Sequence, residues 1–182
     1  KFMIKNLVIP MAGLGKRFQK KNFSTVKPLI TIDKKSIFEE SINDLPFSKN
    51  KIAIINKKIF DKYQVLKNIL KKNNIKNFLL NHETLGQSDT CYKAKRLIKK
   101  EEDLFIHSCD YIMKYSHKEF KKITSKSDVI IFTYKLKSSI VKNYDDFAYC
   151  KTRNGKVLKI IEKKTISKTP QNDQMAIGSF WF

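Results

Sequence analysis

The chain has 182 residues, of which 41% are hydrophobic and 30% charged, and its formal net charge is +21. This length and hydrophobic content support one domain with a buried core and exclude a disordered chain, and no run of about 18 apolar residues predicts a membrane span. The three cysteines, Cys91, Cys109 and Cys150, form no C-x-x-C pair, which excludes a disulfide scaffold and a cysteine-based zinc module and favours the cytoplasm.

The first two thirds of the chain alternate strand-like and helix-like patterns. Residues 4–10 form a short apolar run without the cleavage site of a secretory signal, which predicts a buried strand. Ser36 and Glu39 have the spacing of a capping box, and apolar residues continue after them at helical spacing. Further strands are expected at 51–55, 75–80, 104–108 and 128–134, and further helices at 59–70, at 88–98 with Ser88 or Asp89 as cap, and after Ser116.

The last third of the chain changes to strand patterns separated by turns. Apolar stretches at 147–152 and 156–162 flank Asn154-Gly155, and Asn-Gly between two such runs indicates a hairpin. A polar stretch at 164–174 is expected to be a loop, and one more strand is expected at 176–182. Because strands separated by helices favour parallel sheets, the predicted class is α/β: a Rossmann-like three-layer αβα sandwich with a mixed, mostly parallel sheet and a small antiparallel hairpin addition.

A small-residue loop follows the first predicted strand. It contains Met11, Ala12, Gly13, Leu14 and Gly15, and then Lys16 and Arg17. Small residues allow a ligand to approach the backbone, loop N–H groups can hold phosphate oxygens, and the two cations add positive charge. An ordinary βα turn remains the alternative. The loop is neither a dinucleotide fingerprint, because Phe18 stands where a small residue is needed, nor a Walker A loop, because Gly15-Lys16 is followed by arginine.

The motif Gly-x-Gly-Lys-Arg-Phe, followed by Lys27-Pro28-Leu29-Ile30, resembles the signature of nucleotidylyltransferases with the sugar-phosphate nucleotidylyltransferase fold. It is most similar to the subgroup with the pattern IPMAG-x-G-x-RF…KPLI, which occurs in capsule and surface-polysaccharide gene clusters. Val26 departs from the proline that is frequent there. Shorter matches follow at Gly86 and at 108–110, 147–149, 162–164 and 177–178. Residues 1–182 are thus expected to form a single nucleotidylyltransferase domain of a natural protein that can be longer.

The resemblance implies an enzyme that moves a nucleoside monophosphate from a nucleoside triphosphate, CTP or UTP, to a phosphorylated small-molecule acceptor and releases pyrophosphate. The default acceptor is a sugar 1-phosphate in capsule or surface-polysaccharide precursor synthesis. Two alternatives remain open: a cytidylyltransferase for a non-sugar phosphate of the phosphocholine or phosphoglutamine type, and a non-catalytic nucleotide-binding module. A homodimer is a possible assembly, and no membrane partner is expected.

The resemblance also implies roles for individual residues. Arg17, Lys27 and Lys163 would be catalytic, and Asp110 would bind Mg²⁺. A second metal ligand is expected beyond Phe182 or is absent. The nucleotide would contact Met11, Ala12, Gly13, Leu14, Gly15, Lys16, Gly86 and Gln87, and the acceptor would contact Tyr111, Glu162 and Lys163.

The strong positive charge has a simpler interpretation than nucleic-acid binding. Only Arg17, Arg96 and Arg153 are arginines among 38 basic residues, and the lysines are spread along the chain. Arginine is the preferred residue for bidentate contacts with phosphates and bases. We interpret the charge mainly as compositional bias and predict no nucleic-acid partner. The three histidines lack metal-ligand spacing, so His107 is expected to be a core or rim residue.

Overall fold

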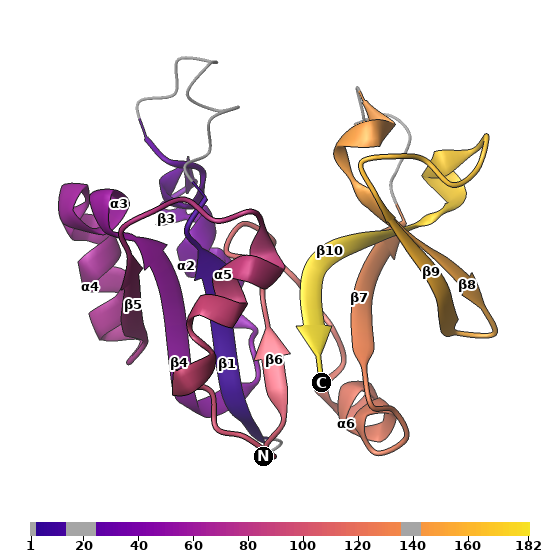
Figure 1. Cartoon of the computed structure of the whole chain (residues 1–182), viewed down its shortest axis with the longest axis horizontal. Coiled ribbons are helices and arrows are strands. Elements are labelled where there is room, and N and C mark those ends of the chain that lie inside the picture. Colours follow the sequence, from indigo (N-terminus) through magenta and orange to yellow (C-terminus); the bar gives the residue numbers. More distant parts are fainter. Residues whose placement is uncertain (1–2, 14–24, 136–142) are drawn as a thin grey trace. The chain divides into compact units, whose positions relative to one another are not determined.

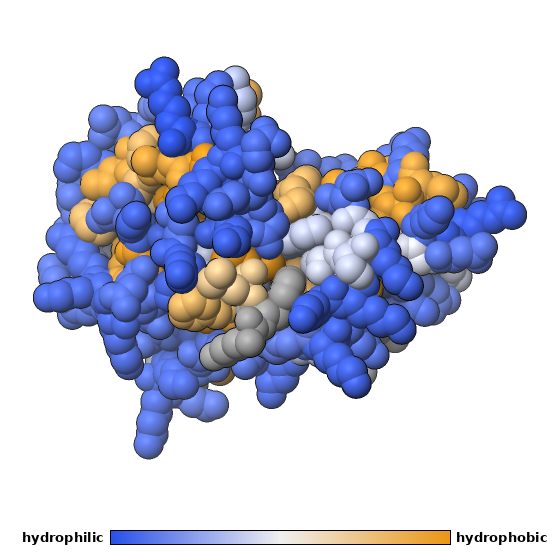
Figure 2. Space-filling model, turned by 90° about the horizontal axis from the view of Figure 1, so that it is seen from below, coloured by the Kyte–Doolittle hydropathy of each residue, from blue (hydrophilic) through white to orange (hydrophobic). Residues whose placement is uncertain are grey.

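The computed structural model describes residues 3–13, 25–135 and 143–182. These residues form two compact units, one comprising residues 1–130 with 180–182 and the other residues 131–179 (Figure 1). None of the helices in the described ranges is long and apolar enough to span a membrane. Hydrophilic side chains cover most of the face drawn in Figure 2, as expected from the lysine-rich composition.

The first unit is built on a mostly parallel sheet with the strand order β5-β4-β1-β6. Each of these four strands is parallel to its neighbour. The last residues of β10, Phe180 and Trp181, pair antiparallel with Ile106 and Phe105 of β6. The strands are β1 (Met3–Met11), β4 (Phe47–Asn56), β5 (Lys76–Leu80), β6 (Leu104–Ile106) and β10 (Gln174–Trp181). The predicted mixed, mostly parallel sheet is confirmed.

Both faces of this sheet are covered, which explains why its central strands are apolar almost throughout. On one face Val8 packs with Ile52 and Ile54, and with Cys91 and Ala94 at α5 (Gln87–Lys93). Leu7 and Ile9, which alternate with Val8 along β1, point to the other face. In Figure 1, α5 lies in front of β1 and α2 (Ile37–Asn43) lies behind it. The three-layer arrangement predicted from the sequence is therefore confirmed.

Two helices begin where the sequence predicts. The hydroxyl of Ser36 accepts the Glu39 N–H at 3.2 Å, and the Glu39 carboxylate accepts the Ser36 N–H at 3.0 Å, so α2 starts with a complete capping box. Helix α6 (His117–Thr124) starts after Ser116, whose hydroxyl accepts the Glu119 N–H at 3.2 Å. Between residues 27 and 36 lie a short 3-10 turn and a two-stranded ribbon: Lys27–Leu29, β2 (Thr31–Ile32) and β3 (Lys35–Ser36).

Two other helix predictions were wrong in detail. The helix expected at 59–70 is two helices, α3 (Lys57–Lys62) and α4 (Gln64–Lys72), because the backbone of Tyr63 between them is extended. The helix expected at 88–98 ends at Lys93, and a 3-10 turn, Lys95–Leu97, follows. Its cap is Gly86 rather than Ser88 or Asp89, because the Asp89 carboxylate instead accepts the Leu85 N–H at 3.0 Å.

The second unit contains the predicted antiparallel hairpin. Strands β8 (Ala148–Arg153) and β9 (Lys156–Glu162) pair antiparallel, and Asn154 and Gly155 form the turn with φ of 51° and 74°. Strand β10 pairs antiparallel with β8, and also pairs with β7 (Ile130–Lys135). The described residues of this unit also include two 3-10 turns: Tyr144–Asp146, and Pro170–Asn172 within the stretch expected to be a loop.

Candidate active site

A cavity of about 360 Å³ lies at the carboxyl end of the parallel sheet in the first unit. This is where open α/β sheets bind ligands, because the loops that leave neighbouring strands diverge there. The cavity is formed by the end of β1, the 3-10 turn before β2, the loop that leads into α5, and the turn after β6. It is lined by Pro10, Met11, Ala12, Gly13, Val26, Lys27, Pro28, Thr84, Gly86, Gln87, Thr90, Ser108, Cys109 and Asp110.

The end of β1 contributes Pro10, Met11, Ala12 and Gly13 to this cavity. Met11 and Ala12 are buried, whereas Gly13 is exposed. A Cβ atom placed on Gly13 or on Gly86 would meet no atom of the described residues within 4 Å. The two glycines therefore leave open room on two walls of the same cavity, as required for a ligand that approaches the backbone closely.

Lys27 and Asp110 form an ion pair inside the cavity. The Asp110 carboxylate also accepts a hydrogen bond from the Ser108 hydroxyl, at 2.5 Å. The Asp110 side chain is 19% exposed and that of Lys27 is 36% exposed, so both remain accessible from the cavity. The sequence places these residues far apart, and the fold places their charges in direct contact.

Backbone hydrogen bonds hold the segment that carries Lys27. The Leu29 N–H donates to the Val26 carbonyl at 2.9 Å, and the Ile37 N–H at the start of α2 donates to the Ile30 carbonyl at 2.9 Å. Pro28 follows Lys27 directly and fixes the backbone of the 3-10 turn. The lysine therefore extends from a short but well-supported turn.

His107 supports the turn that carries Asp110. Its side chain is fully buried, and its Nε2 lies 3.2 Å from the Tyr111 carbonyl oxygen. Because a carbonyl only accepts, this contact is a hydrogen bond when Nε2 carries the proton. Burial lowers the pKa of His107 to about 4, against the opposing influence of Tyr111, Ser41 and Asp110. His107 is therefore a core residue, which is one of the two positions expected from the sequence.

Acid is expected to destabilise the fold through His107. Above pH 6.5 both folded and unfolded chains hold a neutral ring, so the group contributes nothing to pH dependence. Between pH 6.5 and pH 4 the unfolded chain binds a proton that the folded chain does not, and up to about 3 kcal/mol of unfolding free energy is lost. Urea unfolding of the wild type and of His107→Gln between pH 4 and pH 7.5 measures this loss as a pH-dependent difference. A pH-independent difference would contradict it.

The loop that leads into α5 is held by its own polar groups. Thr84 and Thr90 place their hydroxyl oxygens 2.6 Å apart, and the Thr90 hydroxyl donates to the Gly86 carbonyl at 2.8 Å. The Asp89 carboxylate accepts the Leu85 N–H at the outer side of the loop. These bonds fix the position of Gly86 against the cavity.

The structure brings together many of the residues predicted from the sequence. The cavity is lined by Met11, Ala12, Gly13, Lys27, Gly86, Gln87 and Asp110. Leu14, Gly15, Lys16 and Arg17 lie outside the described residues. Tyr111 does not line the cavity. Burial, and to a lesser extent the nearby Asp110 carboxylate, raises the pKa of the Tyr111 hydroxyl.

Glu162 and Lys163 belong to the second unit. They form an exposed ion pair at 3.6 Å, and Lys163 has a φ of 55°, which is uncommon for a residue with a side chain. The Lys163 N–H donates to the Phe147 carbonyl at 2.9 Å. Their roles toward an acceptor therefore stay predictions.

Sequence reasoning gave no site role to three hydroxyl residues that line the cavity. Ser108 stands two residues before Asp110 and orients its carboxylate. Thr84 and Thr90 flank Gly86 on either side. Their only signal in the sequence is closeness to a candidate glycine or aspartate, which becomes informative once the side-chain directions are known.

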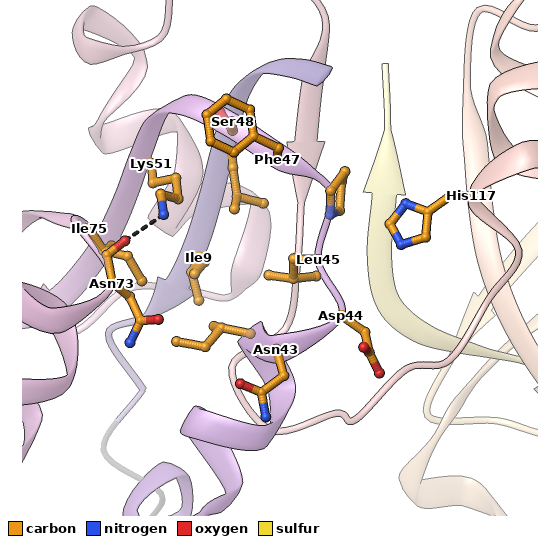
Figure 3. A pocket seen from close by; sticks show the side chains of 13 residues that line it. Ile9, Asn43, Asp44, Leu45, Phe47, Ser48, Lys51, Asn73, Ile75 and His117 are labelled. Atoms are coloured by element: carbon orange, nitrogen blue, oxygen red, sulfur yellow. Dashed lines mark hydrogen bonds between the residues drawn. The ribbon is translucent and has the colours of Figure 1, made fainter. Parts of the chain in front are cut away.

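A second, larger cavity of about 510 Å³ lies elsewhere in the first unit. Its walls include the apolar Ile9, Leu45 and Ile75, and its lysine, Lys51, donates to the backbone carbonyl of Asn73 (Figure 3). None of the residues predicted to bind or react lines it. Size alone thus does not identify the site, and the smaller cavity with the Lys27–Asp110 pair is the candidate.

Comparisons with known proteins bear on the family and the fold. No protein-family model matches the chain. The bifunctional protein GlmU of Buchnera aphidicola subsp. Schizaphis graminum is 30% identical over 162 residues, which are 87% of this chain, and the chain spans 32% of that relative's length.

Solved structures share the fold at lower identity. The nucleoside-diphosphate-sugar pyrophosphorylase from Vibrio cholerae RC9 matches with a TM-score of 0.68 and 21% identity, over 97% of this chain and 72% of that one. The inositol-1-phosphate CTP transferase from T. maritima matches with a TM-score of 0.71 and 12% identity, over 98% of this chain and 70% of that one. The chain therefore has the sugar-phosphate nucleotidylyltransferase fold, which confirms at the level of the fold the resemblance carried by its N-terminal motif.

Proposed function

We propose that the chain transfers a nucleoside monophosphate from a nucleoside triphosphate to a phosphorylated small-molecule acceptor, with release of pyrophosphate. The observation that carries this proposal is the meeting of the Lys27–Asp110 pair with the open backbone at Gly13 and Gly86 in one cavity. Two solved structures with the same fold are named as a pyrophosphorylase and a CTP transferase, which supports the same reaction class.

The chemistry needs positioning and charge neutralisation more than a protein nucleophile. An acceptor phosphate oxygen forms a bond to the α-phosphorus, and the bond from that phosphorus to the bridging oxygen of pyrophosphate breaks. The acceptor is already ionised at neutral pH, so no proton has to be removed. Both reactants are polyanions that repel each other, and the Lys27 ammonium is placed to reduce that repulsion. Arg17 is proposed to bind the leaving pyrophosphate.

The residues of the cavity fit a magnesium ion that is held largely by the substrate. Among the described residues, no three His, Cys, Asp or Glu side chains gather closely enough to hold a metal ion by themselves. Mg²⁺ usually keeps several waters and is held by one or two carboxylates together with phosphate oxygens. Asp110 is the carboxylate that would hold it, and the ion would neutralise triphosphate charge when bound. Ser108 orients that carboxylate.

The finer assignments are part of the same proposal. The preferred nucleotide is CTP or UTP, and the default acceptor is a sugar 1-phosphate for capsule or surface-polysaccharide precursors, made in the cytoplasm. Tyr111, Glu162 and Lys163 are proposed to contact the acceptor. Two alternatives compete with this assignment. One is a cytidylyltransferase for a non-sugar phosphate of the phosphocholine or phosphoglutamine type, and the other is a non-catalytic nucleotide-binding module.

Pyrophosphate release by the whole chain tests the proposal. CTP, UTP, GTP, ATP and dTTP are each combined with sugar 1-phosphates, phosphocholine and phosphoglutamine in the presence of Mg²⁺. Release is expected with one pyrimidine nucleotide and one acceptor. Asp110→Asn is expected to lower it by about 10²-fold or more, because the carboxylate that would hold Mg²⁺ at the triphosphate is lost. Asp61→Asn is the matched control, since Asp61 forms an exposed ion pair with Lys57 in α3. Equal loss in both variants, or none in Asp110→Asn, would contradict the assignment.

A further inference from the structure

The hydroxyl groups beside Gly86 form a chain with a defined direction. The Thr90 hydroxyl lies 2.8 Å from the Gly86 carbonyl oxygen and 2.6 Å from the Thr84 hydroxyl. Thr90 is 3% exposed, so water has little access to its hydroxyl. Thr84 is half-buried, and both threonines line the candidate cavity.

The position of each proton follows from the chemistry of the partners. A carbonyl oxygen can only accept, so the single hydroxyl proton of Thr90 is donated to Gly86. The short contact between the two threonines must then be filled by the Thr84 proton. Thr84 consequently has no proton left to donate, so toward a ligand in the cavity that it lines its hydroxyl oxygen can only accept.

This acceptor contrasts with the cation elsewhere in the cavity. Lys27 can only donate, which suits phosphate oxygens, whereas the Thr84 oxygen would repel them. Thr84 instead suits a ligand group that donates a hydrogen bond. In a nucleoside triphosphate the donors are the base N–H groups, which lie at the opposite end of the molecule from the phosphates, and the ribose hydroxyls, which lie between the base and the phosphates.

We infer that Thr84 reads the exocyclic amino group of the nucleotide base, so that the cavity favours CTP over UTP. The inference rests on the proposed function and narrows the preferred nucleotide from CTP or UTP to CTP. Cytosine carries an amino donor at the position where uracil carries a carbonyl acceptor. Uracil would place two acceptors against each other, unless Thr84 turned its proton toward the base and Thr90 gave up its bond to Gly86.

The affinities of the whole chain for CTP and UTP, measured by titration calorimetry with Mg²⁺, test this inference. The wild type is expected to bind CTP about fivefold or more tightly than UTP, the worth of one neutral hydrogen bond. Thr84→Val removes the acceptor and is expected to bring the ratio of the two affinities to about one. Thr84→Ser keeps the hydroxyl and is expected to keep the preference for CTP.

Thr90→Val tests the direction of the hydroxyl chain. It removes the group that takes the Thr84 proton, which frees Thr84 to donate to the uracil carbonyl. UTP is then expected to gain affinity relative to CTP, although the substitution does not touch Thr84 itself. Thr124→Val is the matched control, because the Thr124 hydroxyl makes a similar bond to the Lys121 carbonyl in α6, outside the cavity.

Each outcome decides the matter. A wild type that binds UTP as tightly as CTP, or a ratio unchanged in Thr84→Val or Thr90→Val, would overturn the inference. Equal weakening of both nucleotides in Thr84→Val would assign the hydroxyl to the ribose instead and would also overturn it. If the chain bound no nucleotide, the proposed function itself would be contradicted. If it bound CTP and UTP equally well, only the role of Thr84 would be contradicted.

Discussion

Replacing Lys27 with alanine is expected to lower pyrophosphate release by about 10²–10³-fold. The loss follows from removing a preorganised cation from the place where the triphosphate charge is proposed to lie, and single groups of this kind contribute rate factors of that size. Lys27 is 36% exposed and its partner Asp110 19%. Such an ion pair contributes about 1 kcal/mol or less to stability, so the variant is expected to remain folded.

A matched variant tests whether the loss of activity comes from the position of Lys27 or from the loss of any one positive charge. Lys57→Ala also removes one lysine and breaks one lysine–aspartate pair, but at an exposed position of α3. It is expected to leave pyrophosphate release within about twofold of the wild type, with a change in stability of a few tenths of a kcal/mol. Steady-state release and thermal unfolding, measured side by side, provide both quantities. Equal losses of activity in the two variants would remove Lys27 from the site.

Introducing a side chain at Gly13 is expected to abolish nucleotide binding without unfolding the chain. Within the part of the chain that the structure describes, a Cβ at this position meets no atom within 4 Å, so Gly13→Val should cost the fold less than about 1 kcal/mol. The branched side chain would occupy the open space of the cavity into which the phosphates are proposed to fit. Titration calorimetry with the preferred nucleotide is expected to show at least about a 10²-fold loss of affinity. Unchanged affinity would refute the proposal that the phosphates bind against the loop backbone at Gly13.

Gly155→Ala is the counterpart to this variant. Gly155 also has open space around it, but its φ of 74° disfavours any side chain, so alanine there is expected to cost about 1 kcal/mol of stability. Because it lies in the turn of the β8–β9 hairpin, nucleotide affinity is expected to be unchanged. The two variants are therefore expected to have opposite outcomes. Gly13→Val loses nucleotide binding and stays folded, whereas Gly155→Ala loses stability and still binds the nucleotide.

Local signals predicted most of the elements. The apolar run of β1, the capping box at Ser36 and the Asn154-Gly155 turn each act over a few residues, and each is present in the structure. The errors concern where helices begin and end, which apolar spacing alone does not specify. The apolar spacing continues through Tyr63, yet its extended backbone divides the helix in two. Likewise Asp89 has the chemistry of a cap but is engaged by Leu85.

The candidate site was predictable in part. The small-residue loop, Lys27 and Asp110 carry signals of residue type and position, and those of them that are described line one cavity. Thr84 and Thr90 carry no such signal, because threonine is common in loops and first helical turns. Only the direction of their hydrogen bonds makes them informative.

By itself, the sequence determined the alternation of strands and helices, the parallel character of the sheet and the loops that could hold a ligand. These depend on side-chain periodicity and on glycine, proline and capping residues, all of which act locally. The tertiary structure alone decided that β6 lies beside β1, that Lys27 meets Asp110, and that the Thr84 and Thr90 hydroxyls are in contact. Those properties depend on which buried faces pack together, and apolar patterning specifies that a face is buried without specifying its partner.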